Sequence, residues 1–493
     1  MAELQLLTAL RAESVAVGGA DTVLGKGPHR AQRAAAALSE RLAAGTAVAL
    51  VGVAGGLAAH VSTGDLVVPS TLRTADADVS VHLPASALLT AELRRSRATV
   101  HTGGLVSSTS FVRLAERERL TATGAEAVDM ESAWVASTLQ DEHPVVVVRA
   151  ISDTAERSPV LGGLAALRAL RTVREPLVRW ARALGPREVL LASPRSFCAG
   201  VERAIEIVER AIIQFGAPVY VRRQIVHNLH VVTNLESRGA VFVQELDEVP
   251  PGSVVVFAAH GVSPEVRRVA VERGDLTVID ATCPLVAKVH AEARRFASRG
   301  YSLVLIGHAD HEEVVGTVGE SPGRFHVVAD TDDVGRLELD DDAPVAVLTQ
   351  TTLATDEAAV VIDALRSRFR SIESPPADDI CYATQNRQDA VRAIARRCDL
   401  LLVVGSQNSS NTLRLVELAQ REGVRAELVE DASEVRLEWL AGAHTIGLSA
   451  GASVPEALVD GVLEALRGLG PVRISEERVA EENVRFALPG RVR

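Results

Sequence analysis

The sequence VLLASPRSFCAGVERAIEIVERAI, residues 189–212, contains the strand-and-helix unit on which the fold of this chain depends. Its apolar start, residues 189–193, predicts a buried strand that ends at small and polar residues. A helix is expected next, because apolar residues recur at intervals of four, three and four: Val201, Ile205, Val208 and Ile212. Cys198 lies at the N-terminal end of this helix, where amide groups and the helix dipole stabilise a thiolate. This position favours a metal-ligating cysteine over an inert buried one.

The same unit recurs through residues 187–473, where apolar runs stop at small and polar residues and helical patterns begin. Such runs are typical of buried parallel strands, and ligands bind beyond the carboxyl ends of these strands. Helix capping explains single Ser or Asn residues at such positions, but it does not require His or Cys. The sequence therefore predicts one shared site at the strand ends, with residues that include Cys198, His260, Cys283, His308, His311, Gln350, Thr351, Ser409, Asn411 and Ser453.

The composition is that of a folded protein, with 47% hydrophobic and 24% charged residues in a chain of 493. This length corresponds to about three globular units. A formal net charge of -12 argues against nucleic-acid and anionic-membrane partners, because the whole molecule would repel them. The first residues lack the basic segment of a secretory signal, and no apolar stretch reaches the ~20 residues of a membrane span. We therefore expect a soluble cytoplasmic protein.

Predicted strands alternate with predicted helices on both sides of a Gly/Pro break at residues 185–188, so we expect an α/β fold in two domains. The first domain covers residues 1–183, the second covers residues 187–473, and residues 474–493 form a C-terminal tail. The elements expected in the first domain are strands at 47–57 and 145–153 and helices at 27–44 and 168–185.

The chain has four cysteines, which are too few for a disulfide scaffold and too far apart in sequence for the CxxC pairs of zinc ribbons. Cys398 lies between a predicted helix and a buried strand, and we interpret it as a small buried hydrophobe. The other three suit either a Cys₃His zinc site or a [4Fe–4S] cluster with one open iron. The histidines available for the zinc alternative are His227, His260, His308 and His311. With neutral donors for a phosphate nearby, the second alternative is a cluster enzyme acting on a phosphorylated small molecule.

Residues 187–473 resemble the 4-hydroxy-3-methylbut-2-enyl diphosphate reductase family. The motifs that carry the resemblance occur in the family's order: FCAGVERAI, IVHNLHVV, AAHGVS, DATCPLVAKVH, GHADHEEVVGT, LTQTTL, DICYATQNRQ, GSQNSSNTLRL and SAGASVPEALV. The resemblance implies a three-lobed, pseudo-threefold α/β fold around a central [4Fe–4S] iron–sulfur cluster. It also implies reduction of the hydroxylated diphosphate to isopentenyl and dimethylallyl diphosphate, with ferredoxin or flavodoxin as electron donor. The alternative for this domain is a zinc-bound regulatory module.

The resemblance also implies roles for individual residues. The cluster ligands are Cys198, Cys283 and Cys381. The diphosphate-binding positions are His227, His260, Ser409, Ser410, Asn411 and Ser453. His311, Glu313 and Thr351 match residues near the substrate's hydroxymethyl group, with Glu313 as the proton-delivering acid. The family's His-Pro-Glu reads His311-Glu312-Glu313 in this chain, so a second carboxylate stands beside the expected acid.

Two glycine-bearing turns stand out in the first domain, GKGPHRAQRAA at 25–35 and GVAGGL at 52–57. Glycine lets backbone amides approach a phosphate or a sugar closely, with a helix N-terminus behind. These turns, with TGDLVVPS, GAEAVDMES and RAISD, resemble the superfamily of nucleoside phosphorylases and methylthioadenosine/S-adenosylhomocysteine nucleosidases. The resemblance implies a phosphorylase-like α/β domain that takes a purine nucleoside.

By the same resemblance, Met130 and Glu131 hold the ribose and Asp153 protonates the purine leaving group, so that Glu131 and Asp153 take part in cleavage of the N-glycosidic bond. Glu13 matches an N-terminal catalytic acid. The region between TGDLVVPS and HTGG is short for this superfamily. A binding or docking module that has lost the chemistry therefore remains the alternative for this domain.

Overall fold

The computed structural model describes residues 3–76, 78–84, 86–112, 114–155, 159–375 and 379–492. Residues 1 and 493, the outer ends of the predicted first domain and tail, lie outside the described residues. The chain divides into two compact units. The first consists of Met1–Val189, Asp431–Ile446 and Asp460–Ile474, and the second of Leu190–Glu430, Gly447–Val459 and Ser475–Arg493.

The N-terminal part is built on a ten-stranded sheet with the order β6-β5-β8-β9-β3-β10-β4-β7, and β1 pairs with both β2 and β3. Its strands are β1 (Leu4–Thr8), β2 (Thr22–Val23), β3 (Ala47–Gly56), β4 (Leu66–Val67), β5 (Thr71–Thr74), β6 (Ser80–His82), β7 (Val100–His101), β8 (Gly104–Ser107), β9 (Ala125–Asp129) and β10 (Val145–Asp153). The predicted strands are confirmed as β3 and β10, which pair in parallel and are almost entirely buried.

The helices of this part are α1 (Arg11–Ala16), α2 (Pro28–Ser39), α3 (Ser86–Arg95), α4 (Leu114–Thr121), α5 (Ser132–Leu139), α6 (Pro159–Leu170) and α7 (Arg174–Ala183). The helix predicted at 27–44 is confirmed as α2. The single helix predicted at 168–185 is wrong, because α6 ends at Leu170 and a turn precedes α7. In this turn the Thr172 hydroxyl donates to the Ala169 carbonyl at 2.8 Å, which is a local bond that competes with helix continuation.

The C-terminal part contains three small sheets, each with its own strand order. The first has the order β13-β12-β14-β15, with β12 (Val219–Arg222), β13 (Ala240–Val243), β14 (Val254–Phe257) and β15 (Thr277–Asp280). The second has the order β17-β16-β18-β19, with β16 (Ser302–Ile306), β17 (Phe325–Val328), β18 (Pro344–Thr349) and β19 (Ser371–Glu373). The third has the order β21-β20-β22-β11-β23, with β11 (Arg187–Ser193), β20 (Leu400–Val404), β21 (Ala426–Val429), β22 (Thr445–Ala450) and β23 (Val472–Arg478). All pairings of the first two sheets are parallel.

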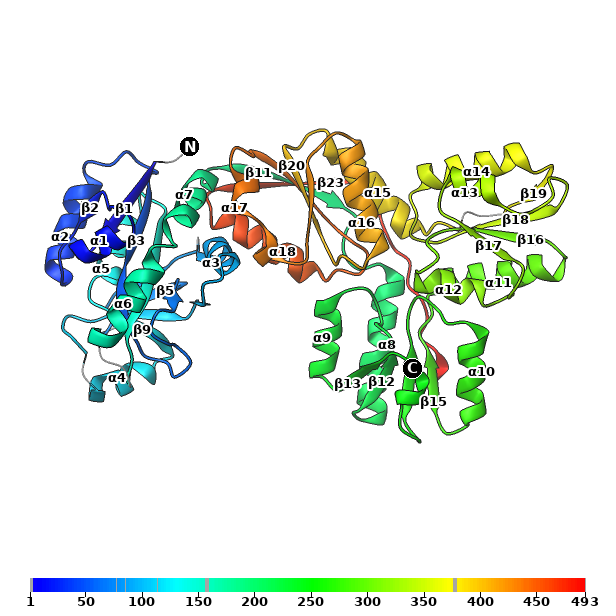
Figure 1. Ribbon diagram of the computed structural model, residues 1–493, viewed down its shortest axis with the longest axis horizontal. Helices are drawn as coiled ribbons and strands as arrows, with labels where there is room; N and C mark the ends of the chain where they lie inside the picture. Colours follow the sequence, from blue (N-terminus) through cyan, green and yellow to red (C-terminus); the bar gives the residue numbers. More distant parts are fainter. Residues whose placement is uncertain are drawn as a thin grey trace. The chain divides into compact units, whose positions relative to one another are not determined.

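Helices cover both faces of the first two of these sheets (Figure 1). The helices that follow β11 in the chain are α8 (Ala199–Phe215), α9 (Leu229–Ser237), α10 (Pro264–Arg273), α11 (Pro284–Ser298), α12 (Glu312–Val318), α13 (Thr331–Arg336), α14 (Thr355–Arg368), α15 (Tyr382–Ala395), α16 (Ser410–Arg421), α17 (Leu437–Leu440) and α18 (Glu456–Arg467). Short 3₁₀ turns are η1 (Leu246–Glu248), η2 (Ala432–Glu434) and η3 (Gly490–Val492). The alternation of strands and helices predicted from the sequence is confirmed. The carboxyl ends of many strands lead into loops at which helices begin.

Helix α8 shows how this packing works. The apolar face expected from spacing packs against the core of the first sheet, but only Val208 of that face is among the five most deeply buried residues of the helix. These are Gly200, Ala204, Ile207, Val208 and Ala211. Small residues at the centre of the contact let the helix approach its sheet closely, and each fully buried Val or Ile side chain contributes roughly 1.5–3 kcal/mol.

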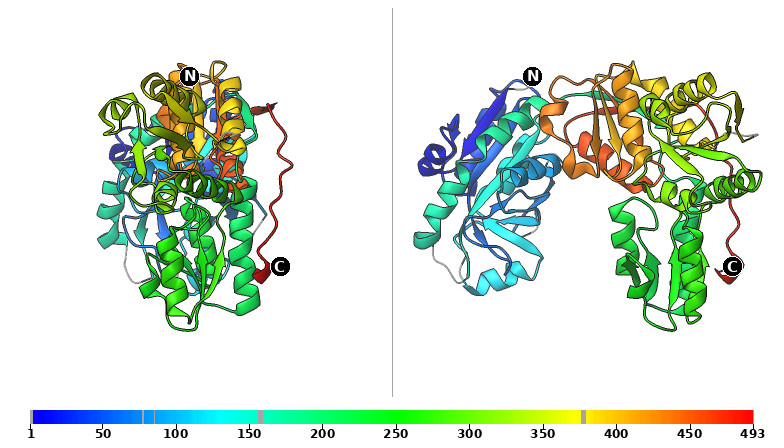
Figure 2. Two further views of the ribbon diagram at one scale, coloured as in Figure 1. Left: turned by 90° about the vertical axis from the view of Figure 1, so that its right-hand side faces the viewer. Right: turned by 45° about the vertical axis from the view of Figure 1, so that its right-hand side comes forward.

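The C-terminal segment is not a detached tail. Strand β23 spans the expected boundary at residues 473/474 and pairs in the third sheet. Beyond it the chain runs without regular structure to η3 (Figure 2), where Val492 is buried in the core of the first sheet. Arg203 on α8 donates through Nε to the Ala487 carbonyl at 2.8 Å. Within the described residues, no helix has both the length and the apolarity needed to cross a membrane.

Candidate active site

One cavity of about 110 Å³ lies in the C-terminal part, where strand ends from all three small sheets meet. The structure brings the expected reductase-site residues together in its lining: Cys198, His227, His260, Cys283, His311, Glu313, Thr351, Cys381, Ser409, Ser410, Asn411 and Ser453. They come from nine different strand ends, so the site depends on the packing of all three sheets.

The three cysteines of this cavity occupy equivalent places in the fold. Cys198, Cys283 and Cys381 are the N-cap residues of α8, α11 and α15, so each thiol lies at the positive end of a helix dipole. The first turn of α8 passes close to a second cysteine, because a Cβ atom added to Gly200 would lie 2.7 Å from Cys283 Sγ. Glycine at this position therefore lets two of the three cysteines face the same space.

Burial controls the ionisation of two of these thiols. It raises the pKa of Cys283 to about 11 and that of Cys381 to about 12, and the neighbouring cysteines raise both pKa values further. Backbone amides of the following helical turns act in the opposite direction, but they do not outweigh desolvation. Thiolates at these positions therefore need a compensating positive charge inside the cavity.

The spacing of the cysteines separates the two metal alternatives. Among the described residues, one group of three or more His, Cys, Asp or Glu side chains has its ligand atoms all within 4.8 Å of one another. It lies elsewhere and consists of His60, His101 and Glu126. The sulfurs of Cys198, Cys283 and Cys381 are thus more widely spread than this limit. A single tetrahedral zinc with Zn–S bonds of about 2.3 Å requires sulfurs about 3.8 Å apart. The spacing favours a multinuclear centre over one zinc ion.

Three histidines form a compact group on another side of the cavity. The rings of His227 and His260 stack with centroids 4.0 Å apart and planes at 14°, and His311 meets His227 edge-on at 5.5 Å. Burial lowers the pKa of both His227 and His311 to about 4 and that of His260 well below its usual range. All three rings are therefore neutral at physiological pH before an anion arrives.

The hydrogen bonds of these rings leave polar atoms without partners. His311 Nδ1 accepts the Glu313 amide at 3.2 Å, which places the ring proton on Nε2. Within the described part of the chain, neither His311 Nε2, His260 Nε2 nor either ring nitrogen of His227 has a hydrogen-bond partner. Buried polar groups are rarely left unsatisfied, so this arrangement indicates a polar ligand.

The loop before α16 supplies a further donor. Asn411 Oδ1 accepts the Ala452 amide at 2.9 Å, which fixes the side chain with Nδ2 as the remaining donor. Nδ2 is buried and has no partner in the described ranges. Ser409 is the N-cap of α16, and the Ser453 hydroxyl donates to the His227 carbonyl at 3.0 Å, which ties the third sheet to the histidine group.

Glu313 is the buried carboxyl group of this site. Its Oε1 accepts the Thr351 amide at 2.7 Å, and its Oε2 accepts the Thr351 hydroxyl at 2.9 Å. Burial raises the pKa of Glu313 to about 7, although both hydrogen bonds from Thr351 lower it. Thr351 also accepts the Cys381 amide at 3.0 Å, so it connects the acid to the third cysteine.

The neighbouring carboxylate has a different environment. Glu312 forms an ion pair with Arg223 at 3.1 Å, and its side chain is 24% exposed. It does not line the cavity that Glu313 lines. The second carboxylate of the His-Glu-Glu sequence is therefore engaged with a cation, whereas Glu313 faces the histidines and cysteines.

Arg387 on α15 is a site-supporting residue that the sequence did not reveal. Its guanidinium is fully buried, and it donates to the Ser196 carbonyl at 2.7 Å, to the Phe197 carbonyl at 3.2 Å and to the Glu482 carboxylate at 3.0 Å. These bonds connect the helix that begins at Cys381 with the loop that ends at Cys198. Arg387 lies in the DICYATQNRQ motif, but the motif does not reveal its partners, because Ser196, Phe197 and Glu482 are far away in the chain.

Two of the residues expected in the N-terminal site, Glu131 and Glu13, lie close to a buried arginine. Glu131 Oε1 accepts the Gly27 amide at 2.9 Å, and burial followed by nearby Asp129 raises the pKa of Glu131. Arg149 is fully buried and pairs with Asp129 at 2.8 Å and with Glu131 at 4.0 Å. Glu13 is buried and accepts the amides of Leu10 and Val53. A single Arg within the apolar run VVVVRAISD was the available sequence signal for Arg149.

Asp153, the expected proton donor to a purine, forms an ion pair with Arg117. Arg117 also donates to the Gly56 carbonyl at 3.2 Å. Met130 and Asp153 line a cavity of only about 40 Å³, which Glu131 does not line. The structure thus places a guanidinium group against the carboxyl group that would have to carry the proton.

Comparison with known families matches this two-part organisation. Residues 189–467, more than half of the chain, match the LytB protein family, and residues 14–162 match the phosphorylase superfamily. The chain is 57% identical over 315 residues to 4-hydroxy-3-methylbut-2-enyl diphosphate reductase 2 of Mycobacterium bovis, a match that covers 63% of this chain and 95% of that protein. It is 55% identical over 308 residues to the corresponding reductase of Cutibacterium acnes, covering 62% and 95%.

The fold agrees with these matches. The chain resembles the solved structure of the E-1-hydroxy-2-methyl-but-2-enyl-4-diphosphate reductase from Plasmodium falciparum with a TM-score of 0.60 and 37% identity, over 62% of this chain and 97% of that one. The family match, the identity and the three-sheet fold agree in the same region. The chain therefore belongs to the LytB protein family, with a phosphorylase-superfamily domain fused on its N-terminal side.

Proposed function

We propose that residues 187–473 reduce 4-hydroxy-3-methylbut-2-enyl diphosphate to isopentenyl and dimethylallyl diphosphate. The observation that carries the proposal is the convergence, in one cavity, of three cysteines, a carboxyl group with a pKa of about 7 and several buried donors without partners. The 57% identity to the mycobacterial reductase supports the same substrate. The reaction consumes two electrons and two protons and releases the hydroxyl oxygen as water.

The donor set of the cavity fits an iron–sulfur cluster. Cys198, Cys283 and Cys381 would hold it, because soft thiolates select such clusters and the sulfurs are too widely spread for one zinc ion. The positive charge that these buried thiolates need would also come from the irons. When bound, a [4Fe–4S] cluster with three protein ligands supplies electrons one at a time and an iron that acts as a Lewis acid. Ferredoxin or flavodoxin is the donor proposed for these electrons.

The histidines and the α16 loop bind the diphosphate. Asn411 Nδ2 and His311 Nε2 are donors without partners among the described residues, and the N-terminus of α16 offers amides and a favourable dipole. An anion held beside His227 and His260 favours their protonated forms and so opposes the effect of burial on their pKa values. Binding of the diphosphate therefore favours proton uptake by these two histidines, which gives the neutral cavity a positive charge beside the anion.

Glu313 and Thr351 hold the proton for the departing oxygen. The Thr351 amide donates to Oε1 of Glu313, so the carboxyl group takes its proton on Oε2; the hydrogen bond to the Thr351 hydroxyl then reverses, with Oε2 as donor and the hydroxyl oxygen as acceptor. A hydroxyl group both accepts and donates, which lets Thr351 pass this proton to an oxygen in the cavity. Near neutral pH, a substantial fraction of Glu313 carries the proton because its pKa is about 7.

The N-terminal domain is proposed to act as a binding or docking module, not as a nucleosidase. The specific observation is the ion pair between Asp153 and Arg117, because the carboxyl group expected to act on the purine is already engaged by a guanidinium group. The small cavity beside it supports the same interpretation. Glu131 accepts the amide of the Gly27 turn, and Met130 lies beside the small cavity with Asp153, so both remain candidates for contact with a bound ligand.

Replacing Cys198 by Ser should remove most of the iron from anaerobically purified protein, since a hydroxyl group is a poor substitute for a soft thiolate. The wild-type chain should hold about four irons. Cys398→Ser is the matched control, because Cys398 packs beside the core of α15 and β20 and not in the cavity. Loss of iron from Cys398→Ser, or retention in Cys198→Ser, would overturn the assignment of the ligands.

Glu313→Gln should lower kcat about 10²- to 10⁴-fold, the usual scale for loss of a general acid, while iron content stays unchanged. In the wild type, kcat/KM should fall as the pH rises through about 7, because the protonated form of Glu313 in the free enzyme is lost there. This limb should be absent from the pH profile of the variant.

Glu312→Gln serves as the control for that experiment, since Glu312 is paired with Arg223 outside the cavity. Its kcat should stay close to that of the wild type. If Glu312→Gln lost most of its kcat while Glu313→Gln kept that of the wild type, the wrong carboxylate would have been assigned as the acid.

Asn411→Asp should raise KM for the diphosphate about 10- to 100-fold, the value of one hydrogen bond to a charged group. The aspartate keeps the acceptor for the Ala452 amide but replaces the Nδ2 donor with an anionic oxygen. Asn408→Asp is the control, because Asn408 is exposed on the same loop and donates to Gln224. An unchanged KM in Asn411→Asp would mean that the diphosphate binds elsewhere.

Incubation of the full chain with 5′-methylthioadenosine, S-adenosylhomocysteine or adenosine should release no more adenine than the Asp153→Asn variant does. Chromatography of the products measures the free base directly. Adenine release that disappears in Asp153→Asn would refute the docking module and show that Asp153 is a working acid despite its pairing with Arg117.

A further inference from the structure

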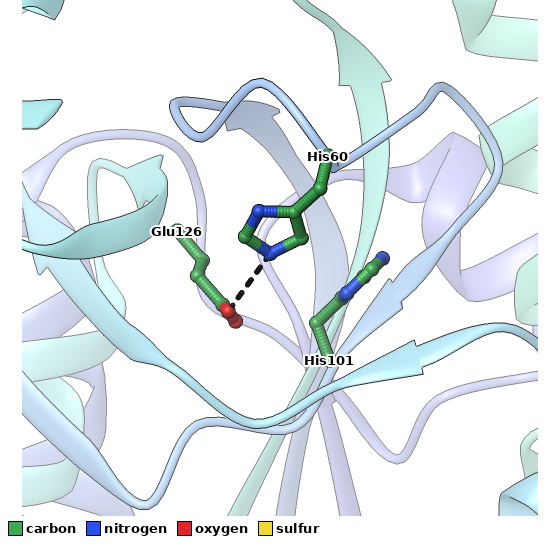
Figure 3. Close-up of side chains that lie close together, drawn as sticks. All are labelled: His60, His101 and Glu126. Atoms are coloured by element: carbon green, nitrogen blue, oxygen red, sulfur yellow. Dashed lines mark hydrogen bonds and ion pairs between the residues drawn. The ribbon is translucent and has the colours of Figure 1, made fainter. Parts of the chain in front are cut away.

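We propose that His60, His101 and Glu126 form a binding site for a divalent transition-metal ion of the zinc class in the N-terminal part of the chain. Their ligand atoms all lie within 4.8 Å of one another. Figure 3 shows the three side chains converging on a common space from three separate segments. Two imidazoles and one carboxylate are a ligand set that suits zinc and similar ions, whereas Mg²⁺ and Ca²⁺ prefer oxygen ligands alone.

The backbone places Glu126 in this position by an irregularity of the sheet. Between β8 and β9, Gly104 pairs with Ala125 and Leu105 pairs with Ala127, so Glu126 is the extra residue of a β-bulge. The Glu126 carbonyl accepts the Leu57 amide at 2.8 Å, which attaches the end of β3 at the same point. Bulges redirect side chains and are frequent beside functional sites.

The carboxylate of Glu126 is held in a fixed orientation. Its Oε2 accepts the Gly103 amide at 2.6 Å, which leaves Oε1 3.1 Å from His60 Nε2. A Cβ atom on Gly103 would overlap the Glu126 side chain, so only glycine permits this approach. Oε1 and His60 Nε2 are then available to one ion between them.

His101 carries the support that metal-ligating histidines usually have. Its Nε2 lies 2.9 Å from Asp65 Oδ2, and the same oxygen accepts the Ser62 amide at 2.8 Å. Metal-bound histidines commonly donate their other ring N–H to a carboxylate, which orients the ring and increases its basicity. With Nε2 engaged by Asp65, Nδ1 of His101 is the atom left for the ion.

An ordinary surface ion pair between His60 and Glu126 would not need these features. Such a pair requires neither the bulge nor a glycine beneath the carboxylate, nor a second carboxylate behind the other histidine. The His60 side chain is 60% exposed, so an ion has access from solvent and keeps an open position for water. A bound ion would connect the loop after β3, which carries His60, to strands β7 and β9, which carry His101 and Glu126.

Zinc bound by the full chain, purified anaerobically with its iron, tests this site. Equilibrium dialysis against buffered free Zn²⁺, followed by elemental analysis, gives zinc and iron per chain. His101→Ala and Glu126→Gln should each bind about one zinc fewer than the wild type, with iron unchanged. His82→Ala is the control, because His82 is an exposed histidine on β6 of the same sheet, and it should bind as much zinc as the wild type.

Asp65→Asn extends the test to the support of His101. It should keep the zinc stoichiometry but weaken the affinity about 10- to 100-fold, as loss of an outer-shell carboxylate does. Equal zinc binding by the wild type, His101→Ala and Glu126→Gln would overturn the site. An Asp65→Asn affinity equal to that of the wild type would also overturn it, by showing only adventitious binding to exposed side chains.

Discussion

The reductase part of this chain depends on holding three cysteine sulfurs in one cavity, where burial raises the pKa values of Cys283 and Cys381. No single sheet supplies all three. Each cysteine ends a strand segment and begins its own helix, so three sheets must pack with their strand ends facing one another. Gly200 and Arg387 serve this same requirement, the first by close approach to Cys283 and the second by joining the Cys381 helix to the Cys198 loop.

The electrostatics of the cavity follow from that burial. The histidines are neutral and Glu313 titrates near neutrality, so the cavity provides donors and an acid without a fixed cationic side chain in its lining. The irons of the proposed cluster would supply positive charge to the thiolates, and a bound diphosphate would favour the protonated forms of His227 and His260. A bound diphosphate should also favour the protonated form of Glu313, since a nearby negative charge disfavours the carboxylate.

Much of this arrangement could be predicted from the sequence, because the strand-end pattern is local. The helix after Cys198 and the strands at 47–57 and 145–153 could be read from spacing and apolar runs alone. The break between α6 and α7 was missed although Pro176 signals it, because proline cannot donate to a carbonyl one turn earlier and so opposes a continuous helix through an otherwise amphipathic pattern. The stacking of His227 on His260, the Arg117–Asp153 pair and the group around His101 join residues distant in sequence. Such contacts depend on tertiary packing and, for Glu126, on a bulge that leaves no mark in composition.

The most direct test of the central claim is a turnover assay on the anaerobically purified chain with 4-hydroxy-3-methylbut-2-enyl diphosphate and a chemically reduced dye, with iron and acid-labile sulfide measured in the same sample. Iron and sulfide are expected in equal amounts of about four per chain, together with formation of isopentenyl and dimethylallyl diphosphate. Protein with a full complement of iron and sulfide that forms neither product would contradict this claim.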